Sequence, residues 1–274
     1  MARSASRAID LHSVNRSLQT NRYDREAPAY RELWAPVVGV AGVRLLRELG
    51  SAPARRILDV GAGVGSLWPG LQRRFAGAFV AGFDRSPGML ALAPREVPRG
   101  VMDAAHLGVA PACVDLVLLV LVLFHLQRPV EGLREARRVL RPGGRVATAT
   151  WGSELRSRAA RVWADCLDAH GAKEDDPVQQ ARHEPVSTPE KLETLLRIAE
   201  LTPERCWAEE VVARCDLEKF VSIHTRLGAA KARFDSLAPG ARTAFLAASR
   251  RRLAELAPED FVARGQVVYS LASA

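Results

Sequence analysis

The sequence predicts an α/β fold built on a mostly parallel β-sheet. In the middle of the chain, short apolar runs alternate with longer helical patterns, as they do in consecutive β-α-β units. A glycine-rich turn follows the first of these runs at residues 61–65, where such sheets bind their ligands. Of the 274 residues, 48% are hydrophobic and 26% are charged, a balance that suits one large core with insertions.

Five strands with intervening helices are expected in the first 150 residues. The strands are predicted at residues 56–60, 78–83, 100–102, 115–121 and 145–150. A helix over residues 129–140 has the clearest end, because Pro142 breaks a helix and Gly143 and Gly144 can adopt positive φ. Helix and strand therefore alternate up to residue 150.

The remaining chain combines two strands with further helices. A polar linker at 173–188 precedes a helix at 189–199, a strand at 206–213, a helical stretch at 217–256 and a strand at 266–271. A helical stretch between the last two strands cannot lie within the sheet, so we expect it to cover one sheet end together with the N-terminal segment. The predicted organisation is a helical cap at 1–50, a ligand-binding core at 51–152, and a segment at 153–274 that completes the sheet and carries the lid insertion at about 217–256.

The basic character of the chain raises the question of nucleic-acid binding, since its formal net charge is +8 and its pI is near 9.9. Lysine occurs only at Lys173, Lys191, Lys219 and Lys231, and the basic excess is arginine scattered through helical stretches. No Lys or Arg run alternates with aromatic residues, as a base-stacking groove requires. We therefore expect a small-molecule substrate and no nucleic acid, and the oligomeric state stays open.

The cysteines and histidines form no metal-binding pattern. Cys113, Cys166, Cys206 and Cys215 share no C-x-x-C spacing, and no histidine lies in a metal motif. The N-terminus lacks the apolar stretch of a signal peptide, and the longest apolar run is far below the ~20 residues that span a membrane. The sequence thus predicts a cytoplasmic protein with reduced thiols, no metal and no membrane association.

The strongest signal lies at residues 57–67, where a buried strand leads into the pattern D-x-G-x-G-x-G and a helix start. Glycines allow both the tight turn and the close approach of a ligand. Dinucleotide-binding loops read G-x-G-x-x-G, whereas here the third glycine comes one residue early, at Gly65, and Ser66 takes the expected place. The spacing disfavours a dinucleotide, although a dinucleotide-dependent oxidoreductase and a tight turn without a ligand remain alternatives.

Two further acids lie where a nucleoside would need them. Asp84 ends the second strand about 25 residues after Asp59, near the ~20-residue spacing of a carboxylate that accepts hydrogen bonds from ribose hydroxyls. Its alternative role is that of a solvated turn residue. Asp103 follows the third strand and can accept from an adenine amino group, with Met89 beside the ring. A helix-capping or turn role explains Asp103 nearly as well.

These residues resemble a known family. The segments DVGAGVGSL, FDRSPGML, MDAA, VDLVLLVLVLFHL and VLRPGG look, in this order, like the motifs of class I S-adenosylmethionine (SAM) dependent methyltransferases. They are closest to the branch that resembles quinone-biosynthesis and bacterial natural-product enzymes, and the resemblance covers residues 50–152. It implies a Rossmann-like seven-stranded sheet in the order 3-2-1-4-5-7-6, with the last strand antiparallel. It also implies SAM as cofactor and methyl transfer to an oxygen, nitrogen or carbon of a small molecule, in secondary metabolism.

The resemblance also implies a cofactor site. By matching positions, the glycine loop and Asp59 would line the methionine part, Asp84 the ribose, and Met89, Asp103 and Ala104 the adenine, while the fourth strand passes beneath the sulfonium. That strand departs from the family, because its residues 118–120 are all apolar where polar residues are frequent. The expected cofactor-binding residues are Asp59, Gly61, Ala62, Gly63, Gly65, Asp84, Arg85, Met89, Met102, Asp103, Ala104, Leu119, Val120 and Leu121.

Methyl transfer from SAM is an in-line displacement, so the protein must mainly hold the acceptor about 3–3.5 Å from the methyl carbon and exclude water. After the fourth strand the chain lacks the [DNS]-P-P-[YF] motif of enzymes that methylate the amino groups of nucleobases and glutamine, and it shows no convergent carboxylates for metal-assisted catechol methylation. The acceptor atom is left open. A SAM-fold binding or regulatory module without turnover is a further alternative.

His125 follows the fourth strand directly, and the resembling family often has a histidine there. Its ordinary pKa of about 6.5 suits a general base, and a substrate anchor is the other functional role. Packing against the next helix is the structural alternative. Above the methyl group we expect aromatic and polar lid residues, although ordinary helix packing could explain each of them. These are Tyr23, Tyr30, Trp34, Phe220, His224 and Phe234.

Overall fold

The computed structural model describes residues 11–175, 177 and 181–274, and of residues 11–18 the backbone alone. Its sheet has seven strands in the order β3-β2-β1-β4-β5-β7-β6, in which β7 runs antiparallel to both neighbours. The predicted strand order and the antiparallel last strand are therefore confirmed. The strands are β1 (Arg56–Val60), β2 (Phe79–Asp84), β3 (Arg99–Val101), β4 (Val114–Val120), β5 (Leu140–Arg156), β6 (Thr202–Ala213) and β7 (Ala263–Ser273).

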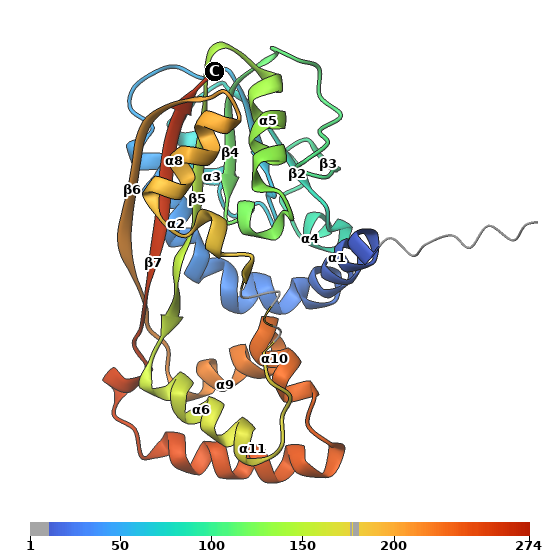
Figure 1. Ribbon diagram of the computed structural model, residues 1–274, viewed down its shortest axis with the longest axis vertical. Helices are drawn as coiled ribbons and strands as arrows, with labels where there is room; N and C mark the ends of the chain where they lie inside the picture. The colour runs from blue at the N-terminus through green and yellow to red at the C-terminus, as the bar shows by residue number, and fades with distance from the viewer. Residues whose placement is uncertain (1–10, 176, 178–180) are drawn as a thin grey trace, which may run out of the picture.

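Helices precede the sheet, cover both of its faces and form a separate lobe (Figure 1). The α-helices are α1 (Leu11–Ala29), α2 (Ala35–Glu48), α3 (Trp68–Arg74), α4 (Pro87–Ala91), α5 (Pro129–Val139), α6 (Arg158–Ala169), α8 (Pro189–Ile198), α9 (Leu217–Arg226), α10 (Gly228–Asp235) and α11 (Pro239–Ala254). The short turns are η1 (Tyr30–Trp34, π-helical), η2 (Leu123–His125), η3 (Glu184–Val186) and η4 (Pro258–Phe261).

The end of α5 differs slightly from the prediction. The helix stops at Val139, and Leu140 already pairs with Val114 as the start of β5. Gly143 has a φ of +73°, whereas the turn does not require positive φ at Gly144. The register between β4 and β5 shifts after the first pair, so the residues of the turn are accommodated as an irregularity at the start of β5.

Side-chain alternation along β4 divides the core into two layers. Val117 and Leu119 pack with α5 and α8 on one face, while Leu116 and Leu118 pack with α2 and α3 on the other. Figure 1 shows α5 and α8 on the viewer's side of the sheet. Since both faces are covered, β4 is continuously apolar in the sequence from Leu116 onward.

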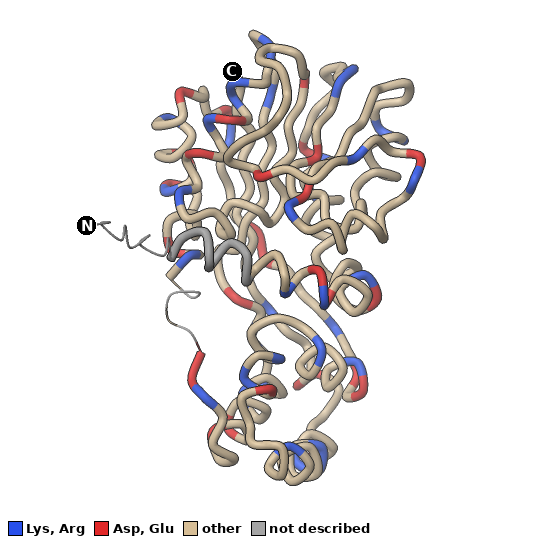
Figure 2. Tube along the Cα trace, turned by 90° about the vertical axis from the view of Figure 1, so that its right-hand side faces the viewer, with Lys and Arg blue, Asp and Glu red and all other residues tan. Residues whose placement is uncertain are grey.

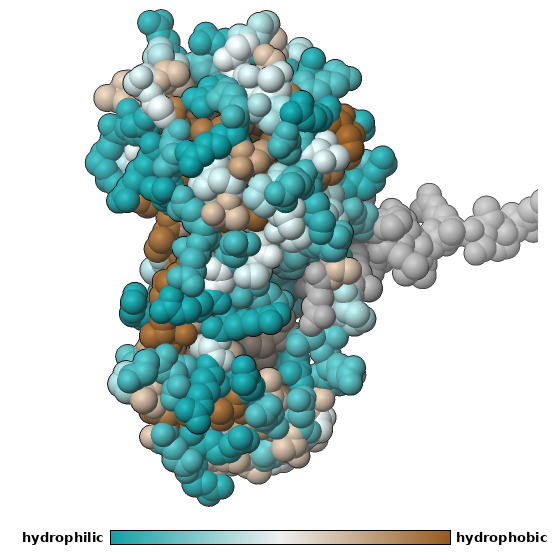
Figure 3. Space-filling model, turned by 60° about the vertical axis from the view of Figure 1, so that its left-hand side comes forward, coloured by the Kyte–Doolittle hydropathy of each residue, from teal (hydrophilic) through white to brown (hydrophobic). Residues whose placement is uncertain are grey.

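The helical lobe consists of α6, α9, α10, α11 and η4, and it lies beyond the carboxyl end of the parallel strands. β5, β6 and β7 extend from the sheet to reach it (Figure 1). The lobe has its own core, in which Trp163 contacts Phe220 and Phe245 edge to face. Figure 3 shows apolar side chains at the waist, where the long strands pass from sheet to lobe.

The N-terminal cover, residues 11–34, lies between the sheet and the lobe (Figure 1). Leu33 and Ala29 of the cover pack against Leu227 of the lobe. Glu26 accepts a hydrogen bond from the Gly228 backbone N–H at 3.0 Å, and burial raises the pKa of this carboxyl. On the other side, Ala27 of the cover packs with Val64 and Met89, so the cover contacts both other parts of the molecule.

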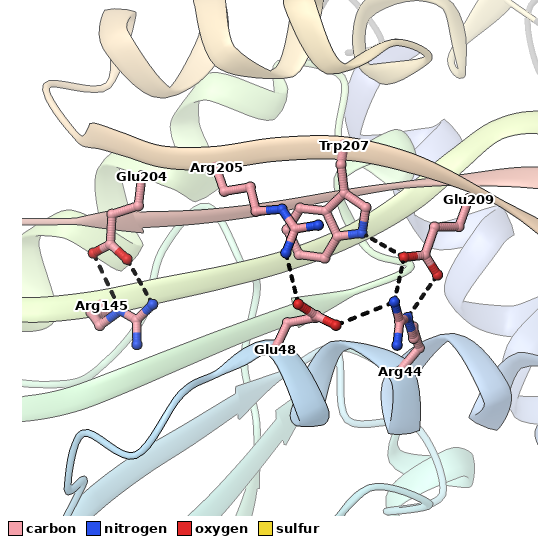
Figure 4. A network of polar contacts seen from close by, with 7 residues as sticks. All are labelled: Arg44, Glu48, Arg145, Glu204, Arg205, Trp207 and Glu209. Carbon is pink, nitrogen blue, oxygen red and sulfur yellow. Dashed lines mark hydrogen bonds and ion pairs between the residues drawn. The ribbon is translucent and has the colours of Figure 1, made fainter.

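A network of polar contacts ties α2 to the far edge of the sheet (Figure 4). Arg44 donates two hydrogen bonds of 2.7 Å to Glu209 of β6, and Arg205 bonds Glu48 at 2.7 Å. Trp207 stacks on Tyr269 and donates to Glu209. Surface pairs contribute only about 0.2–1 kcal/mol each, but together they fix the helix that contributes Val38 and Gly39 to the cleft described below.

Charged residues of both signs are interspersed over sheet and lobe (Figure 2). In the described part of the chain, no helix is long and apolar enough to cross a membrane. The same residues contain no group of three or more side chains that could hold a metal ion, and the four cysteines are free thiols.

Candidate active site

A cleft opens at the carboxyl ends of the parallel strands, where the loops after β1, β2, β3 and β4 meet. The cover closes it from the other side. Its lining consists of Gln19, Thr20, Tyr23, Tyr30, Val38, Gly39, Asp59, Gly61, Ala62, Gly63, Val64, Ser66, Leu67, Asp84, Arg85, Ser86, Met89, Met102, Asp103, Ala104, Val120, Leu121, Val122, His125 and Leu126. This is the place where open α/β sheets bind ligands.

The glycine loop builds one wall of the cleft from backbone. The N–H groups of Gly61 and Ala62 donate to the Phe83 carbonyl at 2.7 and 2.9 Å, which ties the loop to the end of β2. Gly61 has a φ of +74°, and a Cβ there would lie 2.2 Å from the Val122 side chain. A larger residue is therefore excluded, and the bare loop leaves room for a ligand.

Gly65 has a different role from the expected one. It does not line the cleft; its φ is +74°, and a Cβ would lie 2.7 Å from the Trp68 ring. Trp68 is fully buried beneath the loop and donates from Nε1 to Asp59 at 3.0 Å. The third glycine thus makes room for this indole.

Asp59 forms the floor of the cleft and is only 2% exposed. Burial raises its pKa from 3.8 to about 7, although the hydrogen bond from Trp68 acts in the opposite direction. A cation bound above Asp59 would favour the ionised carboxylate. The carboxyl is thus suited to holding a cationic group.

Asp84 accepts hydrogen bonds on both of its oxygens. Oδ2 accepts from the Gly63 N–H and Oδ1 from the Ser86 N–H, each at 2.8 Å. Burial raises the pKa of this carboxyl, while the backbone N–H groups of Ser86, Gly63 and Arg85 and the charge of Arg85 oppose that effect. Each carboxylate oxygen has a second acceptor site, so the orientation that the backbone fixes leaves both oxygens able to accept from paired hydroxyls.

The loop after β3 places Met102, Asp103 and Ala104 at the cleft, which the buried Met89 also lines. Asp103 Oδ1 also accepts from the Ala105 N–H at 2.9 Å. Both interpretations of Asp103 therefore have support, since a turn residue can line a cleft at the same time. The wall it belongs to is apolar apart from this carboxylate.

The end of β4 turns sharply into the cleft. Val120 and Leu121 line it, whereas Leu119 is 1% exposed and packs in the core on the α5 face. The expected contact of Leu119 is therefore corrected, because alternate side chains of a strand point to opposite faces. Leu121 has a φ of +59°, which is unusual for a branched residue and marks strain at the strand end.

The cover contributes side chains that sequence reasoning missed. Asp24 Oδ1 accepts from the Ser86 hydroxyl at 2.6 Å and from the Gly88 N–H at 2.8 Å, which docks α1 on the start of α4. Gln19 and Thr20 line the cleft one turn earlier. The described part of α1 has no clear apolar stripe, so no periodic signal in the sequence predicted where it docks.

His125 lines the cleft, and both of its ring nitrogens have partners. Nδ1 is 2.6 Å from Gln19 Nε2, and Nε2 is 3.0 Å from the Tyr23 hydroxyl. Its ring also contacts Phe124, which in turn stacks on His183. Burial, reinforced by the charges of Arg22, His183, Arg85 and Arg182, holds the pKa of His125 well below its usual value. The imidazole is therefore neutral at pH 7.

The expected lid residues divide into two groups. Tyr23 and Tyr30 line the cleft, whereas Trp34 packs with Ile223 at the contact between cover and lobe. The three lobe residues also lie away from the cleft: Phe220 and Phe234 pack in the core of the lobe, and His224 stacks on Phe220. Their placement above the methyl group was wrong, because the lobe needs these aromatic side chains to fill its own interior.

The sheet and its cleft define an α/β protein that binds a ligand at the carboxyl ends of its parallel strands, and sequence comparisons identify the family. The methyltransferase domain family matches residues 58–148. The chain is 30% identical over 240 residues to malonyl-[acyl-carrier protein] O-methyltransferase of Dechloromonas aromatica, covering 87% of this chain and 84% of that one. It belongs to the class I SAM-dependent methyltransferases.

Two further comparisons agree. Demethylmenaquinone methyltransferase of Mycolicibacterium paratuberculosis is 30% identical over 163 residues, which is 59% of this chain and 63% of that protein. A solved type II methyltransferase of Anaeromyxobacter dehalogenans shares the fold with a TM-score of 0.55 at 21% identity, over 84% of this chain and 94% of that one. The protein is thus an enzyme that uses SAM as methyl donor and small molecules as acceptors. The oxidoreductase alternative is excluded.

Proposed function

We propose that this methyltransferase methylates an oxygen of a carboxylate. The observation that carries the proposal is the bonding of His125, whose two ring nitrogens contact Gln19 and Tyr23 and whose pKa is held low. A general base must offer a free lone pair to the acceptor proton. A carboxylate has a pKa of about 4 and is already ionised at neutral pH, so it needs no base. His125 then positions the side chains bonded to it rather than acting as a base.

The electrostatics of the acceptor end favour an anion. Positive charges from Arg22, Arg85 and Arg182 all act on the His125 ring and lower its pKa. The same field attracts a carboxylate and disfavours a protonated amine. An amine acceptor would also have to lose a proton before it could attack the methyl group, and the bonded imidazole offers no site for that proton.

The cofactor side of the proposal follows from the cleft. SAM supplies a methyl group on a positively charged sulfur. Asp84 would accept from the ribose hydroxyls, the wall at 102–104 would hold the adenine, and Asp59 with the loop at 61–63 would hold the methionine part. The bare glycine backbone and the free acceptor sites of Asp84 fit such a ligand. The protein then works by positioning the acceptor oxygen in line with the sulfur and excluding water.

The relatives support an oxygen acceptor in part. The Dechloromonas protein and three similar relatives are named as O-methyltransferases of malonyl-[acyl-carrier protein], although this chain spans only 51–57% of the latter three. Demethylmenaquinone is the acceptor in the names of others. A malonyl thioester with a free carboxylate is therefore the acceptor class that we propose first. The expectation of secondary metabolism gains no support from these names and stays a prediction.

The test measures transfer of labelled methyl from SAM to malonyl-CoA, malonyl-[acyl-carrier protein], demethylmenaquinone and a primary amine. We expect a methyl ester of a malonyl thioester, recognised because mild base releases its label as methanol. The matched control is the same thioester with its carboxylate already esterified, which should accept nothing. Transfer to the amine or the quinone ring alone would overturn the proposal.

The pH profile provides an independent test. With both substrates saturating, a carboxylate acceptor and a neutral His125, kcat should be nearly constant between about pH 6 and 9, because neither group changes charge there. The readout is kcat, because kcat/KM also reports the ionisation of Asp59 in the free enzyme, whose pKa is about 7. A kcat that rises tenfold per pH unit through one ionisation near neutrality would instead identify His125 as a base.

A further inference from the structure

We infer that Gln19 is a positioning residue: it fixes His125 as the Nε2–H tautomer, so that Tyr23 presents its hydroxyl hydrogen to the methyl acceptor. Three hydrogen bonds carry the inference, and they join parts of the chain that are far apart in sequence. Arg85 bonds Gln19 at 3.0 Å, Gln19 bonds His125 at 2.6 Å, and His125 bonds Tyr23 at 3.0 Å.

The orientation of the Gln19 amide is determined by its partner on the other side. A guanidinium can only donate hydrogen bonds, so the amide atom that faces Arg85 must be the oxygen. The amide nitrogen therefore faces His125 and donates to Nδ1. A neutral imidazole carries one proton, and with Nδ1 as acceptor that proton lies on Nε2.

The Tyr23 hydroxyl completes the chain. Because Nε2–H of His125 donates to it, the phenolic oxygen acts as acceptor in this bond. The Arg22 guanidinium opposes the burial that raises the pKa of Tyr23, and it too can only donate to this oxygen. The hydroxyl hydrogen is then left for a third partner, and Tyr23 lines the cleft at its acceptor end. A hydroxyl with this orientation donates to an anionic acceptor oxygen and holds it in place.

The charged and titratable groups around the ring come from three parts of the chain. Arg22 and Tyr23 belong to the cover, Arg85 follows β2, and Arg182 and His183 precede η3. The positive charges all oppose the addition of a second proton to His125. The ring therefore stays neutral, as a single tautomer, rather than becoming an imidazolium. The last step, donation to an anionic oxygen, rests on the proposed carboxylate acceptor, whereas the tautomer does not.

The tautomer is measured directly by ¹⁵N NMR of the histidine rings in the full-length protein, where a protonated and an unprotonated ring nitrogen differ in chemical shift. His125→Asn assigns the signal by its disappearance. The wild type should show protonated Nε2. In Gln19→Glu the carboxylate accepts from Nδ1–H, so the proton should move to Nδ1 or the ring should become doubly protonated. Gln127→Glu adds the same charge on an exposed side chain two residues from His125 and should leave the tautomer unchanged.

Kinetics test the consequence. Gln19→Glu should lower kcat about 10- to 100-fold, the range expected for one lost hydrogen bond to a charged group, with affinity for S-adenosylhomocysteine kept within about threefold. Tyr23→Phe should lower kcat similarly while His125 keeps its Nε2 proton. Arg85→Gln, which removes the donor that orients the amide, provides a second variant should Gln19→Glu fail to fold, and it should give a mixture of tautomers.

Three outcomes would overturn the inference: a wild-type ring protonated on Nδ1, an unchanged tautomer in both Gln19→Glu and Arg85→Gln, or full turnover of Tyr23→Phe. The NMR result does not depend on the acceptor. If the proposed carboxylate acceptor is wrong but the tautomer shifts as expected, Gln19 keeps its positioning role and the acceptor assignment alone fails.

Discussion

The N-terminal cover and the helical lobe both lie at the carboxyl end of the sheet, yet they relate to the cleft in different ways. The cover places Gln19, Tyr23 and Tyr30 in the cleft lining. The lobe directs Phe220 and Phe245 into a core of its own. An aromatic side chain near an active site therefore indicates a lid only when the segment that carries it has no hydrophobic core of its own. The cover has none, and it depends on the rest of the molecule for burial.

The largest expected effect tests whether the cover completes the active site. Deletion of residues 1–34 should abolish methyl transfer, because Tyr23, Tyr30 and the Gln19 contact to His125 are all lost. Circular dichroism should still show the folded sheet, and S-adenosylhomocysteine should still bind. A truncated enzyme that methylates its acceptor at the normal rate would show that the cover takes no part in the reaction.

The second prediction compares an aspartate of the sheet with one of the cover. Asp84→Ala should weaken binding of both SAM and S-adenosylhomocysteine by about 10²- to 10⁴-fold, because hydrogen bonds to a charged group contribute about 1.5–3 kcal/mol each. Asp24→Ala is the matched control, since Asp24 also accepts two hydrogen bonds but lies on the cover. It should change affinity less than about tenfold by calorimetry. Equal losses in the two variants would mean that the cover binds the cofactor as strongly as the sheet does.

The third prediction uses the pH dependence of stability to test the buried carboxyl at the cleft floor. Burial raises the pKa of Asp59 from 3.8 to about 7, so the folded state favours the protonated acid. The stability that this group contributes is complete below pH 3.8 and is lost as the pH rises through about 7. The difference corresponds to about 4 kcal/mol. In Asp59→Asn, which still accepts from Trp68, the free energy of unfolding in urea should fall less between pH 4 and 8, by about this amount. Parallel pH profiles of variant and wild type would refute the assignment.

The sequence predicted the sheet well, and also the part of the cleft that the loops after its strands form, because local sequence patterns encode these features. β1 is found at its predicted bounds, and the spacing from Asp59 to Asp84 brings both carboxyls to one cleft. Gly65 shows the limit of such reasoning. The glycine pattern indicated a ligand contact, but the space this glycine leaves is filled by Trp68, three residues further along the chain.

The cover and the lobe could not be placed from the sequence, because long-range contacts determine where they pack. Gln19 meets His125 across 106 residues and Asp24 meets Ser86 across 62. No local pattern encodes such pairs. Leu119 and Val120 point to opposite faces of the sheet. Because β4 is buried on both faces, its sequence shows no apolar–polar alternation from which these two directions could be assigned. The lobe helices had recognisable apolar positions, but whether these face a cleft or one another is a property of the packed tertiary structure.

The smallest expected effect concerns the lobe. Phe234→Ala removes a half-buried ring that contacts Phe245 with centroids 5.7 Å apart. The variant should lose about 1–2 kcal/mol of unfolding free energy, less than for a fully buried phenylalanine. Its kcat and KM should stay within about twofold of the wild type at a temperature where both proteins are folded. Tyr30→Ala, the same kind of truncation in the cover, should raise KM for the acceptor, because Tyr30 lines the cleft. If Phe234→Ala impaired turnover more than Tyr30→Ala while folding normally, the lobe would have to reach the acceptor during catalysis, and the distinction between a cover that completes the site and a lobe that packs on itself would fail.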